Sequence, residues 1–144
     1  MNLLDLFGVS LSDICKPYAD NEALYNQARA FYQQLENFSS FFLVLSVVLS
    51  IVVAWLYFGP YNNRPGRHYR LMCWIVSLLL TAILTFGVTF GIECLAVTTN
   101  IRGAWLYEIQ IAAISCCYAI VFYLLATFVI HNWLPTNACR FFKF

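Results

Sequence analysis

Apolar residues dominate three long segments of this chain, and polar residues collect in the pieces between them. The apolar segments cover residues 39–58, 71–97 and 105–133. A helix needs about 20 apolar residues to cross the hydrocarbon core of a bilayer. The pattern therefore predicts three transmembrane helices, joined by a polar loop and by a short second loop.

A helical apolar stripe precedes the first of these segments. Apolar residues recur there every three or four positions, at Leu24, Ala28, Phe31, Leu35 and Phe38. This spacing places them on one face of an α-helix. Neither glycine nor proline occurs between Leu24 and Phe58, where the first apolar segment ends. We expect one continuous helix that is amphipathic from about residue 21 and spans the membrane from about residue 39.

These patterns divide the chain into three parts. Residues 1–38 form an amphipathic N-terminal region outside the cytoplasm, which begins with a short segment that ends near Pro17. Residues 39–133 form a three-helix transmembrane domain, and residues 134–144 form a tail at the cytoplasmic membrane surface. The predicted fold is an all-α integral membrane protein whose first span continues a long extramembrane helix.

The composition excludes several classes of protein. Hydrophobic residues make up 62% of the chain and charged residues 10%, against about 45–50% and 25% in soluble domains. An ordinary soluble enzyme is therefore excluded. Eight Lys and Arg residues against seven Asp and Glu residues leave a net charge of +1, which argues against nucleic acid as a partner.

The basic residues predict the orientation in the membrane. Arg64, Arg67 and Arg70 form a basic patch in the first loop, and Arg140 and Lys143 lie in the tail, in both cases without an acidic residue. A three-span chain has both segments on the same side. The positive-inside rule then places the N-terminus outside and the C-terminus in the cytoplasm, or on the equivalent side of an organelle. The patch could instead dock a cytoplasmic partner or an anionic ligand.

A polar ribbon follows the second span at a strict spacing of four residues. It consists of Ser77, Thr81, Thr85, Thr89 and Glu93, which share one slowly drifting face of a helix. Three interpretations compete, and one of them is chance spacing or exposure to lipid. The hydroxyls could bond to backbone carbonyls and to neighbouring helices. Alternatively, several copies could line a pore, with Glu93 as a ring of acids at its mouth.

Small residues at the same spacing mark further contact faces. They are Ser46 and Ser50 in the first span, Gly87 and Gly91 in the second, and Ala112 and Cys116 in the third. Small residues at this spacing let helix backbones approach closely in a membrane. Together with the stripe of Leu24, Phe31 and Leu35, they favour a homo-oligomer or contact with other subunits.

Candidate chemistry is sparse. No Cys-x-x-Cys pair occurs, and neither histidine lies in the middle of a span, so we expect no metal and no cofactor. We also expect free thiols rather than a disulfide between Cys15 and Cys94. The hypothesis is a non-enzymatic, self-associating membrane protein with pore-like lining on its second span. The alternatives are an accessory or scaffold subunit of a hetero-oligomeric membrane complex and, third, a small membrane enzyme.

Overall fold

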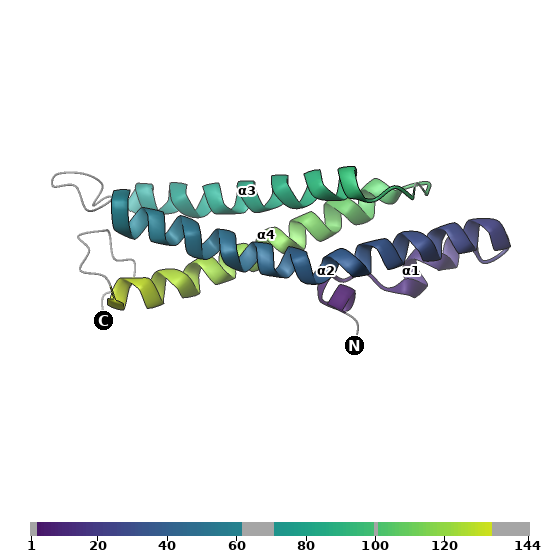
Figure 1. The fold of residues 1–144 in the computed structure, drawn as a ribbon, viewed down its shortest axis with the longest axis horizontal. Coiled ribbons are helices and arrows are strands. Elements are labelled where there is room, and N and C mark those ends of the chain that lie inside the picture. Colours follow the sequence, from purple (N-terminus) through teal and green to yellow (C-terminus); the bar gives the residue numbers. More distant parts are fainter. Residues whose placement is uncertain (1–2, 62–70, 100, 134–144) are drawn as a thin grey trace. The chain divides into compact units, whose positions relative to one another are not determined.

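The computed structural model describes residues 3–61, 71–99 and 101–133, and these residues contain no strand (Figure 1). Three short helices come first: η1 (Leu3–Phe7), α1 (Leu11–Cys15) and η2 (Lys16–Tyr18). Gly8 makes the turn after η1 with a φ of 67°. The Ser10 side chain then caps α1 by accepting a hydrogen bond from the Asp13 amide at 3.3 Å.

The long first helix, α2 (Glu22–Leu56), is continuous over 35 residues, as the uninterrupted ribbon in Figure 1 shows. Asn21 fixes its start, because the side-chain oxygen accepts hydrogen bonds from the amides of Ala23 and Leu24 at 3.1 and 3.3 Å. These two amides would otherwise lack partners in the first turn. The expected continuous helix is therefore confirmed.

The α2 helix runs into η3 (Tyr57–Tyr61), a π-helical turn that contains Pro60. Because proline has no amide hydrogen, regular α-helical hydrogen bonding cannot continue through it. The two remaining helices are α3 (Leu71–Ala96) and α4 (Ala104–Trp133). Their bounds agree within one residue with the predicted second and third spans.

Three stretches are long and apolar enough to cross a membrane: Glu22–Tyr61, Leu71–Ala96 and Ala104–Ile130. They indicate a multi-pass membrane protein. The chain forms two compact units, each built from two parts of the sequence. The first unit contains Met1–Val44 and Phe86–Ser115, and the second contains Leu45–Thr85 and Cys116–Phe144.

The first unit has a core that the short N-terminal helices help to build. Leu4 and Phe7 of η1 and Ile14 of α1 are fully buried, as are Phe31 and Leu35 of α2. Polar side chains hold the N-terminal segment against α4 and the loop before it. Gln110 donates to the Gly8 carbonyl at 2.9 Å, Tyr107 donates to the Asp13 carbonyl at 3.2 Å, and Tyr18 donates to the Arg102 carbonyl at 2.9 Å.

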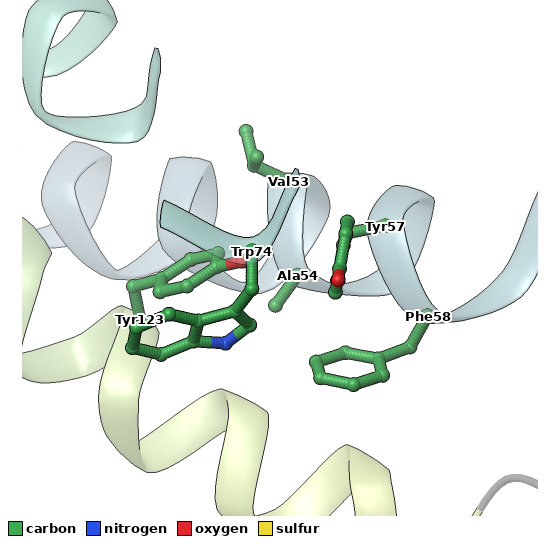
Figure 2. Packing of buried hydrophobic residues seen from close by; sticks show 6 residues of the cluster. All are labelled: Val53, Ala54, Tyr57, Phe58, Trp74 and Tyr123. Carbon is green, nitrogen blue, oxygen red and sulfur yellow. The ribbon is translucent and has the colours of Figure 1, made fainter. Parts of the chain in front are cut away.

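The second unit has an aromatic core, shown in Figure 2. Trp74 of α3 lies against Tyr123 of α4, with ring centroids 6.0 Å apart. The rings of Tyr57 and Phe58 pack edge to face, with their centroids 5.0 Å apart. Val53 and Ala54 of α2 complete the cluster. Large aromatic side chains from three helices thus determine the packing of this unit.

Candidate functional site on the polar ribbon

The half of the ribbon that lies in the second unit uses its hydroxyls within the chain. Thr81 and Thr85 are fully buried, and each donates to the backbone carbonyl four residues earlier at 2.9 Å. Ser77 shares a short hydrogen bond with the Tyr123 hydroxyl and also contacts the Trp74 carbonyl at 2.8 Å. These three side chains bond to their own helix and to α4.

The half in the first unit differs in its hydrogen bonding. Thr89 and Glu93 are also fully buried. The Thr89 hydroxyl and both Glu93 carboxylate oxygens have no hydrogen-bond partner among the described residues. Buried polar groups in folded proteins normally have such partners. This contrast within one ribbon identifies Glu93 as its chemically unusual residue.

A second carboxylate belongs to the same unit as Glu93. Glu108 of α4 is half-buried and acts electrostatically on Glu93. It also lines a polar cleft of about 440 Å³ at the end of α3 and the start of α4. Cys94, Thr98 and Arg102 line the same cleft. Glu108 therefore lines an open polar surface and also contributes to the electrostatic environment of the buried Glu93.

An uncompensated charge is costly at the Glu93 position. An ionised carboxylate without partners loses several kcal/mol or more when it leaves water. Acidic residues inside membrane helices are rare for this reason, and they commonly mark ion or proton sites. The arrangement can therefore bind a proton, a cation or a donor group of a partner molecule.

The small residues fall into covered and open groups. The Ser50 hydroxyl oxygen lies 2.8 Å from the Ala119 carbonyl and 2.6 Å from the Ser46 carbonyl, so it links α2 to α4. Ser46 and Ala112 are fully buried, and Cys116 is half-buried. Gly87 and Gly91 differ, because a Cβ atom added at either position would meet no atom within 4 Å.

The predicted N-terminal contact stripe is largely covered by the chain itself. Phe31 and Leu35 are fully buried, whereas Leu24 is 42% exposed. Of the three, Leu24 alone is open to contact by another molecule. The basic patch of Arg64, Arg67 and Arg70 lies outside the described residues.

Several structural contacts of the first unit were not expected from the sequence. Tyr18, Tyr107 and Gln110 hold the N-terminal segment through main-chain carbonyls, which leave no mark in a sequence pattern. Gln110 could have been noticed as an amide within an apolar span. The five cysteines among the described residues have free thiols in the structure. Among the described residues, no cluster of three or more His, Cys, Asp or Glu could hold a metal ion.

Comparison with protein-family models, curated proteins and solved structures finds no match for this chain.

Proposed function

We propose that this chain is a non-enzymatic, self-associating multi-pass membrane protein that assembles through the Gly87/Gly91 face of α3. The main support is the open space beside both glycines, where an added Cβ would meet no atom within 4 Å. Two glycines four residues apart allow close helix contact in a membrane, where packing rather than hydrophobic burial drives association. Ser46, Ser50 and Ala112 are buried within the chain, whereas the face with Gly87 and Gly91 has no neighbouring side chain within 4 Å of an added Cβ.

The buried ribbon supports the same assignment of faces. Ser77, Thr81 and Thr85 already have partners within the chain, which favours a helix-packing role for this half of the ribbon. A pore-like role would therefore depend on Glu93 and Thr89.

Substitution of the glycines tests the proposal. Gly87→Leu and Gly91→Leu add side chains into open space, so the single chain should fold as before. We expect the oligomer in mild detergent to shift to monomer, as measured by light scattering after size exclusion. Val88→Leu is the matched control, because Val88 is also exposed on α3. An unchanged oligomer in both glycine variants would refute this interface.

For the orientation, we propose an N-terminus outside and a C-terminus in the cytoplasm, in a plasma membrane or an organellar equivalent. Support comes from the arginines of the first loop and the basic tail, which share one side of a three-span chain. On this basis, the basic patch contacts anionic lipid at the inner surface.

A specific observation favours a second candidate, an accessory subunit of a hetero-oligomeric membrane complex. The first unit has a cleft of about 510 Å³, lined in part by Leu11, Cys15 and Tyr25. Leu11, Leu24 and Tyr25 are also exposed, so a partner could bury them. A monomeric wild type would favour this candidate, whereas a discrete oligomer favours self-assembly.

A further inference from the structure

The strongest unexplained feature of the molecule is the Glu93 carboxylate. It is fully buried, and neither oxygen has a hydrogen-bond partner among the described residues. The Thr89 hydroxyl, one helical turn earlier on the same face, is also buried and without a partner in the described part of the chain. Two independent side chains thus leave polar atoms unsatisfied on one face of α3.

The number of oxygen donors decides which ligand fits. Glu93 and Thr89 together offer two carboxylate oxygens and one hydroxyl, whereas Ca²⁺ takes six to eight oxygen ligands and Mg²⁺ prefers six. The described residues also hold no cluster of acidic, histidine or cysteine side chains that suits a metal ion. A proton needs one carboxylate oxygen and removes the whole charge. The bound form is then a neutral acid, which low-dielectric surroundings favour.

The polar cleft of the same unit offers candidate groups for proton transfer to Glu93. Glu108 and Cys94 both line the polar cleft of about 440 Å³, and Cys94 directly follows Glu93 in α3. Glu108 also acts electrostatically on Glu93. The titratable and charged groups that line this cleft are Glu108 on α4, Cys94 on α3 and Arg102 in the loop between them. Glu108 is the carboxylic acid that lines the cleft and also acts electrostatically on Glu93, so it is the candidate group for proton transfer between them.

We propose that Glu93 is an internal proton-binding site that is loaded from the cleft through Glu108. The proton moves from water to the Glu108 carboxylate and then to a Glu93 oxygen, and it leaves by the reverse path. Charge and atoms balance at each transfer, and no other reactant is needed. The site lies within one chain, so the proposal goes beyond assembly and survives if the glycine interface fails.

Infrared spectroscopy of the full chain in phosphatidylcholine vesicles tests the binding step. The carbonyl band of a protonated carboxylic acid differs from the bands of a carboxylate. We expect this band at neutral pH in the wild type, shifted by ¹³C-glutamate labelling and absent in Glu93→Gln. Glu22→Gln is the matched control, because Glu22 is exposed, and it should keep the band. Persistence of the full band in Glu93→Gln would overturn the assignment.

Wild-type protein alone also decides the question if Glu93→Gln does not fold. Isotope labelling covers every glutamate, so the absence of any glutamic-acid band at neutral pH would refute the proposal directly.

Deuterium exchange tests the route. After transfer to D₂O, the Glu93 acid band should shift as its proton is replaced. We expect Glu108→Gln to keep the band but to slow this replacement by about 10²-fold, the lower end for a positioned proton-transfer group. Glu22→Gln should exchange at the wild-type rate. An unchanged rate in Glu108→Gln would show that the proton reaches Glu93 by another path.

Discussion

At the scale of single residues, Gly8 determines how the N-terminal segment meets α4. Its φ of 67° lies in the left-handed region, and an added Cβ would come within 3.2 Å of the Gln110 side-chain nitrogen. We expect Gly8→Ala to lower the free energy of unfolding by about 1–2 kcal/mol, the cost of this conformation in other L-residues. Thermal unfolding in detergent measures the change.

Gly59→Ala is the control for this substitution. A Cβ at Gly59 would meet nothing within 4 Å, and the residue does not have a positive φ. The two variants should therefore differ in melting temperature. Equal effects would mean that the turn at Gly8 does not depend on glycine.

Cys15 gives a pH-dependent prediction at the same scale. Burial raises the pKa of its thiol above the ordinary value, and the Arg29 guanidinium partly opposes this rise. Because Cys15 is buried and Cys94 is exposed, maleimide should label Cys15 more slowly than Cys94. Labelling at equal rates in the folded protein would contradict the burial of Cys15.

The raised pKa of Cys15 also makes the free energy of unfolding depend on pH. The stabilising contribution of the Cys15 thiol is fully present below the pKa of the unfolded state and is lost as pH rises through the higher pKa of the folded state. Cys15→Ser should remove this alkaline component of unfolding. Melting curves at neutral and alkaline pH measure it, and an identical pH dependence in both proteins would contradict the assignment.

At the scale of the helices, hydroxyls of one ribbon should contribute unequally to stability. Ser77→Ala removes a hydrogen bond between α3 and the Tyr123 hydroxyl of α4, which should cost about 1 kcal/mol. Thr85→Val removes only a bond to a carbonyl of its own helix. That carbonyl also accepts from the helix backbone, so this variant should be close to neutral. Denaturation in mixed micelles compares the free energies of unfolding of the two variants. A larger loss of stability in Thr85→Val than in Ser77→Ala would contradict this prediction.

The helices themselves were largely predictable from the sequence. Three apolar segments and the stripe before the first one gave the bounds of α2, α3 and α4, because periodicity reports directly on the burial of a helix face. The ribbon was predictable as a face turned away from lipid. Its role was not, since a helix interface and a water-filled path require the same hydroxyls, and only their partners distinguish the two.

The contacts of the N-terminal segment were beyond sequence reasoning for a different reason. Gln110 and Tyr107 bond to main-chain carbonyls of Gly8 and Asp13, and every residue type carries such a carbonyl. Residue identity at the acceptor therefore contains no signal. The apolar stripe was also ambiguous, because Phe31 and Leu35 have the same spacing whether the chain itself or a partner buries them.

At the scale of the whole molecule, the proposed orientation predicts which thiols an impermeant reagent can reach. An impermeant maleimide applied to intact cells or right-side-out vesicles should label Cys94. Cys139, which lies outside the described residues, should react only after permeabilisation. Cys94→Ser provides the control for the first signal. Labelling of both thiols from one side would contradict a three-span chain with its termini on opposite sides.

The long-range hydrogen bonds of the first unit also affect how the protein is made. Gly8 and Gln110 are 102 positions apart, and Tyr18 and Arg102 are 84 apart. During synthesis, the N-terminal segment therefore emerges long before the residues that hold it. Until α4 has been made, Leu4 and Phe7 cannot reach their final buried positions. The nascent chain then exposes these apolar side chains to chaperones and to quality-control proteases. Ribosome pausing or truncation before α4 would then cause degradation rather than a partly active product.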